Sequence, residues 1–95
     1  MKEEEVQVVN RLGLHARAAA KLVHLAGRYR SQVTLIKDGE AVEGKSILGI
    51  LLLAASQGVR LTIRCEGDDE AEAIESLADL FARGFEEDIA CPPAE

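Results

Sequence analysis

Two short segments carry side chains whose types and spacing suit chemistry on a phosphoryl group. In the first, Gly13 to Ala20, His15 stands where a loop meets a predicted helix, and Arg17 follows two residues later. A helix N-terminus concentrates free N–H donors and a partial positive charge, so it binds phosphate well. The same field disfavours a protonated imidazole and leaves a ring nitrogen available to attack. A nucleophile, an anion cradle and a forked guanidinium so close together predict phosphoryl transfer through a phosphohistidine.

The alternative interpretation of His15 is a helix cap or a surface residue with no chemical role. His24 provides a comparison within the same predicted helix. It lies in mid-helix, away from free N–H groups, on a solvent-facing stripe with Arg17, Lys21 and Arg28. We therefore interpret His24 as part of a binding face or a solvated face, and not as the nucleophile.

The second segment begins at Lys45 and continues into an apolar run, Ile47 to Ala55. Ser46 precedes that run, and its hydroxyl can accept a hydrogen bond from an otherwise unpaired backbone N–H, so we predict an N-cap. A phosphate there would alter an adjoining surface, which makes Ser46 a candidate regulatory phosphorylation site as well. The run is apolar on nearly every side of a helix. It predicts an exposed docking patch, unless the whole segment is buried.

The elements that must position these segments follow from apolar periodicity and turn residues. We expect strands at 5–9, 32–37, 40–43 and 59–65, and helices at 16–28, after Ser46, and from Asp69 to Gly84. Asp38-Gly39 predicts a hairpin turn, and Asp69 with Glu72 predicts a capping pair. The residues expected to face the core are Ala19, Leu22, Val23 and Ala26 in the first helix and Ala71, Ile74, Leu77, Ala78 and Phe81 in the last.

These elements predict an α+β fold, an open-faced β-sandwich whose four-stranded antiparallel sheet carries three helices on one face, in the order β-α-β-β-α-β-α. We expect a single domain over residues 1–88 and a flexible C-terminal tail over residues 89–95.

Composition and charge exclude several classes of protein. The 95 residues are 47% apolar and 29% charged, which is typical of one soluble domain. Aromatic residues make up only 3%, which disfavours base-stacking nucleic-acid modules, and the net charge of −6 disfavours nonspecific binding to DNA or to an anionic membrane. Residues 6–37 contain basic side chains and no acidic ones, whereas residues 66–88 are strongly acidic. The basic segment predicts an acidic partner or an anionic group.

The sequence carries no metal-binding or targeting signature. Its start lacks the order of a signal peptide, and the run that contains Gly49 is too short to cross a bilayer. Cys65 and Cys91 lack zinc spacing, so we expect two free thiols in a cytoplasmic protein and neither metal nor cofactor. A disulfide in a secreted domain is the alternative.

The stretch Asn10 to Arg17 resembles the active-site motif of HPr, the histidine-containing phosphocarrier family of the bacterial phosphotransferase system. Lys45 to Leu51 resembles its regulatory serine segment, and the resemblance covers nearly the whole chain except the tail. It implies that His15 accepts phosphate at Nδ1 from phosphorylated enzyme I and donates it to an enzyme IIA-type domain, as a carrier and not an enzyme. Arg17 would stabilise the phosphate, and an HPr serine kinase/phosphorylase would modify Ser46.

The resemblance also implies a docking surface, formed by Ala20, Lys21, His24, Ile47, Leu48 and Leu51, with Ile50, Leu53 and Ala54 facing the core. One position departs from the motif, because Ala18 stands where the family usually has Pro. Ala18 restores an N–H donor, so we expect an altered phosphohistidine lifetime or transfer rate and retained function. The ending at 84–88 resembles the nitrogen-related branch, whereas the segment at 45–47 resembles the kinase-regulated carbohydrate branch.

Two other functions remain open from the sequence. The first is a regulatory interaction module whose phosphorylation state at His15 or Ser46 is read by target proteins. The second is a small metabolite-binding or interaction domain with an incidental histidine, which predicts no phosphate on His15. A hydrolase is the least favoured, since no second base or carboxylate adjoins His15. We expect a monomer, because a carrier must dock with its partners in sequence.

Overall fold

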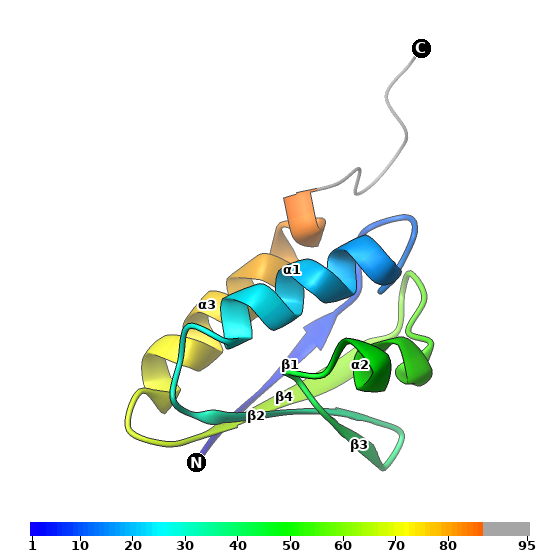
Figure 1. Cartoon of the computed structure of the whole chain (residues 1–95). Helices are drawn as coiled ribbons and strands as arrows, with labels where there is room; N and C mark the ends of the chain where they lie inside the picture. The colour runs from blue at the N-terminus through cyan, green and yellow to red at the C-terminus, as the bar shows by residue number, and fades with distance from the viewer. Residues whose placement is uncertain (87–95) are drawn as a thin grey trace.

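A four-stranded antiparallel sheet, covered on one face by three helices, makes up the computed structural model, which describes residues 1–86 (Figure 1). In chain order the elements are β1 (Lys2–Gln7), α1 (Ala16–Ala26), β2 (Gln32–Lys37), β3 (Glu40–Glu43), α2 (Ile47–Leu53), β4 (Arg60–Glu66), α3 (Glu70–Ala82) and a 3-10 turn, η1 (Gly84–Glu86). The predicted α+β open-faced sandwich and its element order are confirmed. The predicted boundary at residue 88, the tail over 89–95 and Cys91 lie outside the described residues.

The sheet has the strand order β1-β4-β2-β3, so the first strand lies at an edge beside the last. The β2–β3 hairpin turns at Asp38 and Gly39, which both adopt positive φ as the sequence predicted. The predicted first strand is present, but its predicted bounds, 5–9, were wrong, because β1 begins at Lys2 and ends at Gln7. Three glutamates make Lys2–Gln7 a poor strand by propensity. Arg64 of β4 pairs with Glu3 at 2.6 Å and Arg60 with Glu5 at 3.7 Å across the two strands.

The core lies between the sheet and the helices. From β4 the buried side chains are Leu61, Ile63 and Cys65, in the predicted alternation. Helix α1 buries a face rich in alanine (Ala18, Ala19, Leu22 and Ala26), and its neighbours are α2 and α3. The buried face of α3 consists of Ala73, Ile74, Leu77, Leu80 and Phe81, whereas Ala71 is exposed, so that part of the prediction was wrong.

The start of α3 is joined to the loop between α1 and β2. The side chain of Asp69, the N-cap of α3, makes no hydrogen bond to its own helix. Its carboxylate accepts the N–H of Arg30 at 2.8 Å, the N–H of Ser31 at 2.9 Å and the hydroxyl of Ser31. The predicted capping pair of Asp69 and Glu72 is therefore wrong. We call these contacts the Asp69 junction.

Cys65 is a buried free thiol next to that junction, as the sequence predicted for this cysteine. Burial, followed by the charges of Asp69 and Glu70, raises the pKa of the Cys65 thiol to about 11. A thiol with so little thiolate is unreactive at neutral pH, so Cys65 serves as a core residue.

Candidate functional site

The loop before α1 is held against the segment that follows α2. The side-chain amide of Asn10, a fully buried residue, donates to the carbonyl of Gly13 at 2.8 Å. The N–H of Leu14 donates to the carbonyl of Ala55 at 2.9 Å. Gly13 has a φ of +70°, and a Cβ there would lie 2.7 Å from the carbonyl oxygen of Ala55. Only glycine fits at this approach.

His15 occupies the N-cap position of α1. Its backbone is extended, with φ −77° and ψ −179°, and its carbonyl accepts the N–H of Ala19 at 2.8 Å. The ring atom Nδ1 accepts the N–H of Arg17 at 3.2 Å. An accepting Nδ1 carries its lone pair, which assigns the proton of the neutral ring to Nε2. The lone pair of Nδ1 therefore points at the positive end of the helix dipole.

A small surface pocket of about 210 Å³ adjoins the imidazole. It is lined by Leu12, Leu14, His15, Ala54, Ala55 and Ser56. The prediction that Ala54 faces the core was wrong. Helix α2 ends at Leu53, and Ala54 takes a left-handed C-cap conformation with φ +52° that leaves it exposed. The sequence offered no signal for this, because alanine rarely adopts positive φ.

Arg17 and Ala18 follow His15 in the first turn of α1. Arg17 is exposed, and within residues 1–86 its guanidinium makes no hydrogen bond or ion pair, so it can turn towards an anion. Ala18 is fully buried against the core. Each supplies a backbone N–H in the first helical turn, where no carbonyl of the same helix lies within reach.

Ser46 is the N-cap of α2, as predicted. Its hydroxyl accepts the N–H of Gly49 at 3.1 Å, and the residue is half-buried. The neighbouring Lys45 donates to the carbonyl of Tyr29 at 2.8 Å, so its side chain lies along the loop after α1.

Helix α2 exposes an apolar patch beside α1. Its members are the predicted Ile47, Leu48 and Leu51, together with Leu52, which sequence reasoning missed. Only Ile50 and Leu53 of this helix are buried. Leu52 is 72% exposed, and Leu12, at the edge of the His15 pocket, is 66% exposed. The exposure of Leu52 could have been predicted from the sequence. This seven-residue helix is apolar on every side, and only two of its residues are needed in the core, so the others must include exposed ones.

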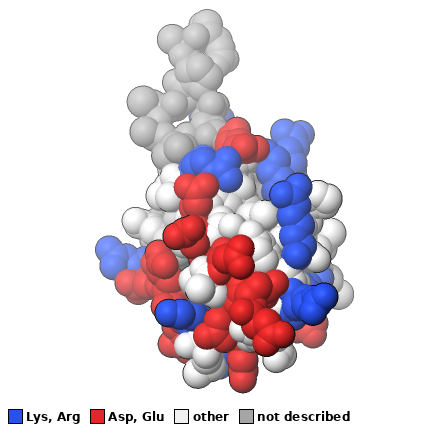
Figure 2. Space-filling view, turned by 90° about the vertical axis from the view of Figure 1, so that its left-hand side faces the viewer, with Lys and Arg blue, Asp and Glu red and all other residues white. Residues whose placement is uncertain are grey.

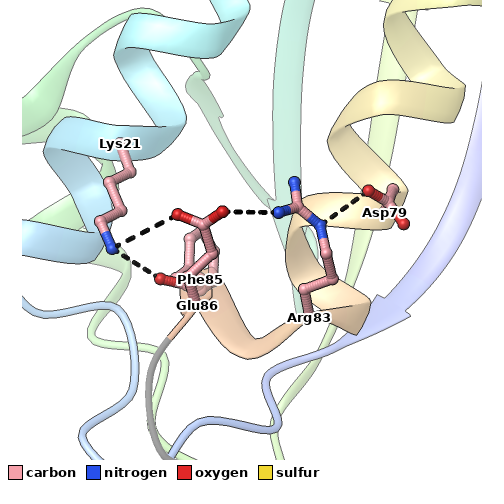
Figure 3. Close-up of polar contacts among 5 residues, drawn as sticks. All are labelled: Lys21, Asp79, Arg83, Phe85 and Glu86. Atoms are coloured by element: carbon pink, nitrogen blue, oxygen red, sulfur yellow. Dashed lines mark hydrogen bonds and ion pairs between the residues drawn. The ribbon is translucent and has the colours of Figure 1, made fainter.

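Of the predicted docking residues on α1, Ala20 and His24 are exposed, whereas Lys21 is engaged by the C-terminal turn. The ammonium group of Lys21 donates to the carbonyl of Phe85 at 2.8 Å and lies 4.0 Å from the carboxylate of Glu86 (Figure 3). The sequence carries no signal for this contact, because the partners are more than sixty residues apart.

Charge is unevenly distributed over the surface. Figure 2 shows acidic side chains gathered on one face of the molecule, with Lys and Arg side chains along its edge. Among residues 1–86 no group of His, Cys, Asp and Glu side chains could hold a metal ion. No described helix has the length and hydropathy needed to cross a membrane.

Known proteins resemble this chain in both sequence and fold. The sequence matches the family model described as the PTS HPr component phosphorylation site over residues 2–83. The phosphocarrier protein HPr of Xylella fastidiosa (strain Temecula1) is 49% identical over 88 residues, which cover 93% of this chain and 99% of that protein.

Two solved structures are similar across most of their length. HPr from Thermoanaerobacter tengcongensis matches with a TM-score of 0.90 and 45% identity, covering 94% of this chain and 100% of that one. Crh from Bacillus subtilis, described as a swapped dimer, matches with a TM-score of 0.72 and 43% identity, covering 88% and 97%.

Proposed function

The chain belongs to the HPr family and is thus a phosphocarrier of the phosphotransferase system, not an enzyme; we propose that it carries the phosphoryl group on His15. The donor is phosphorylated enzyme I, and the recipient is an enzyme IIA-type domain. The observation that carries this proposal is the position of His15 Nδ1, which accepts a hydrogen bond at the N-terminus of α1.

The transfer step follows from that geometry. The lone pair of His15 Nδ1 attacks the phosphorus atom, the bond between phosphorus and the donor nitrogen breaks, and the donor ring keeps the electron pair. The proton of His15 stays on Nε2. The phosphoryl oxygens then become the acceptors for the first N–H groups of α1, including that of Arg17. The Arg17 guanidinium adds charge-assisted hydrogen bonds to the same oxygens.

Docking uses the exposed surface around His15. The apolar patch of α2 provides contact area without large rearrangement, and the basic side chains of α1 attract acidic partners. Such an interface supports fast exchange of partners, which a carrier needs.

A carrier that docks through one face acts as a monomer, and light scattering on a sizing column tests this. A dimer, as described for Crh, would contradict it.

Ser46 is a second phosphorylation site in this proposal. Its hydroxyl caps α2 directly beside Ile47 and Leu48, so a phosphate there changes the charge of the docking surface. An HPr serine kinase with ATP should place an acid-stable phosphate on the wild type and none on Ser46→Ala. Phosphate on both proteins would assign the modification to another residue.

The decisive experiment is incubation with enzyme I and phosphoenolpyruvate, followed by intact-mass analysis before and after acid treatment. The wild type should gain one acid-labile phosphate, and His15→Ala should gain none. His24→Ala is the matched control, because it removes the same side chain from the same helix and should end with the same single acid-labile phosphate, whatever its rate of docking. No phosphate on the wild type, with an enzyme I that labels another carrier, would refute the proposal.

A further inference from the structure

A groove of about 300 Å³ lies between α1 and α3, away from the His15 pocket. Four basic side chains line it: Lys21, His24 and Arg28 from α1, and Arg83 from the end of α3. Glu86 is the acidic residue among those that line it. Because the α1 members belong to the same stripe as Arg17, the groove continues the basic face that begins at the phosphate site.

The carboxylate of Glu86 bridges two of these cations. One of its oxygens, Oε2, lies 2.7 Å from Nη1 of Arg83, and the other, Oε1, lies 4.0 Å from the ammonium of Lys21 (Figure 3). Arg83 is also held at Nε by Asp79, at 2.8 Å. The Glu86 carboxylate therefore occupies the position in which a carboxylate from another molecule would bind Lys21 of α1 and Arg83 at the end of α3.

Lys21 is held in place independently of Glu86. Its ammonium donates to the carbonyl of Phe85 at 2.8 Å. Phe85 is fully buried, and its ring meets that of Phe81 edge-on with centroids 4.9 Å apart. If Glu86 leaves, the ammonium stays directed by the Phe85 carbonyl and retains two further N–H donors for an incoming acceptor.

The contacts of Glu86 are easily exchanged. Its side chain is 60% exposed, and that of Arg83 is 46% exposed. Exposed ion pairs of this kind contribute little, because water solvates both partners when the pair opens. An incoming carboxylate thus meets a low cost of displacement.

We propose that Glu86 is an internal stand-in for a partner's carboxylate, and that an acidic docking partner displaces it from Lys21 and Arg83. The inference rests on the proposed function, since it identifies a regulatory contact on the same docking face. Glu86 lowers the affinity of α1 for acidic surfaces and so favours rapid release of the partner. The occupant of the groove is a protein segment bearing carboxylates, not a free metabolite.

The first test uses a penta-glutamate peptide as the probe, with binding followed by the backbone amide NMR shifts of residues 21–28 at low salt. Glu86→Gln removes the internal competitor, and Glu75→Gln, an exposed residue elsewhere on α3, makes the same change in net charge. We expect the Glu86→Gln protein to bind the peptide about 2- to 5-fold more tightly than the Glu75→Gln protein. The difference should vanish at about 0.5 M salt.

Further substitutions check the proposed contact. Adding Lys21→Met and Arg83→Met to Glu86→Gln should abolish the gain in affinity, because both cations that receive the peptide carboxylate are gone. Equal affinities of Glu86→Gln and Glu75→Gln, a gain that survives the loss of both cations, or no measurable binding to Glu86→Gln would each overturn the proposal.

The same variants separate this inference from the proposed function. With enzyme I as the phosphoryl donor, Glu86→Gln should lower the KM for the carrier by a similar factor relative to Glu75→Gln, with kcat unchanged. If enzyme I labels no variant, the phosphocarrier proposal fails, while the peptide titration still decides the exchange at Glu86. If enzyme I labels His15 and the peptide affinities are equal, only the exchange fails.

Discussion

Helices α1 and α3 both have a polar residue at the N-cap position, but the two side chains bind different partners. At α1 the ring of His15 accepts the N–H of Arg17, in its own helix. At α3 the carboxylate of Asp69 makes no bond to its own helix and accepts hydrogen bonds from Arg30 and Ser31, in the loop after α1. The first arrangement directs a nucleophile along a helix axis, and the second fastens two elements together.

The difference lies in what surrounds each helix start. The Asp69 junction takes hydrogen bonds from two backbone N–H groups and one hydroxyl, so the carboxylate is committed to the fold. His15 instead adjoins a small pocket and the exposed guanidinium of Arg17, so its surroundings suit an incoming anion. An N-cap residue in an open, cationic environment is thus available to bind an anion. An N-cap residue whose side chain accepts hydrogen bonds from the main chain of another element stabilises the fold instead.

The largest effect in this comparison is expected from removing one of two arginine side chains, Arg17 in the first turn of α1 or Arg30 in the loop that contacts Asp69. Arg17→Ala should lower the rate of phosphoryl transfer from enzyme I by about 10- to 100-fold, since it removes one charge-assisted contact to the phosphoryl oxygens. Arg30→Ala should leave the rate unchanged, because Arg30 contributes its backbone N–H to the junction. Rapid-quench measurements on both variants check this, and equal losses would contradict a local role of Arg17.

Two glycines sharpen the comparison further. A Cβ on Gly13 would lie 2.7 Å from the carbonyl oxygen of Ala55, and a Cβ on Gly67 would lie 2.7 Å from Cα of Ser31. Both have positive φ, so each substitution by alanine should lower the free energy of unfolding by about 1–3 kcal/mol. Only Gly13→Ala should also slow the phosphorylation of His15, because it displaces the loop that holds the imidazole.

The control for both is Gly39→Ala, at a positive φ with nothing within 4 Å of the added Cβ. This substitution introduces backbone strain without a steric contact. It should lower the free energy of unfolding by about 1 kcal/mol and have no effect on phosphorylation. Urea unfolding and the labelling assay measure the two quantities. Slower labelling of Gly67→Ala than of Gly13→Ala would break the assignment of the two regions.

The smallest effect concerns pH and stability. The hydroxyl of Ser31, followed by the N–H of Arg30, lowers the pKa of Asp69 below its usual 3.8. A lowered folded-state pKa means that the ionised carboxylate stabilises the fold above 3.8, and that this contribution is lost as pH falls through the folded-state pKa. Asp69→Asn should therefore have a lower Tm than the wild type at pH 7, with the gap narrowing in acid.

Thermal melts by circular dichroism from pH 7 downwards check this expectation. Asp68→Asn, which changes the neighbouring exposed carboxylate, serves as the control and should follow the wild type. Asp69→Asn should accept phosphate on His15 as the wild type does. A Tm gap that is constant across the pH range would contradict a charge-dependent junction.

Sequence reasoning succeeded where the decisive contacts are local. The Asp38-Gly39 hairpin, the alternation of β4 and the Ser46 cap each depend on residues within a few positions of one another, and the structure has all three. His15 was likewise placed at the start of α1 from its neighbours alone.

Three features were missed for one physical reason, which is a partner distant in the chain, whereas Ala54 was missed because of its own positive φ. Glu3 and Glu5 lie in a strand that pairs with β4, where Arg64 faces Glu3 and Arg60 reaches Glu5 on the diagonal. The carboxylate of Asp69 accepts from Ser31 in place of its own helix, and the ammonium of Lys21 donates to the carbonyl of Phe85. The secondary-structure propensity of a segment does not include the free energy of these contacts, because they form only when the helices pack on the sheet.

The hydrogen bond from Leu14 to Ala55 has a consequence for the order of events on the ribosome. The loop that carries His15 is braced by residues made some forty positions later, and β1 pairs with β4, which is later still. A nascent chain that has exposed only its first thirty residues thus holds the whole phosphorylation motif without its brace. On the proposed function, competence to receive phosphate therefore arrives late in synthesis, after the sheet has closed.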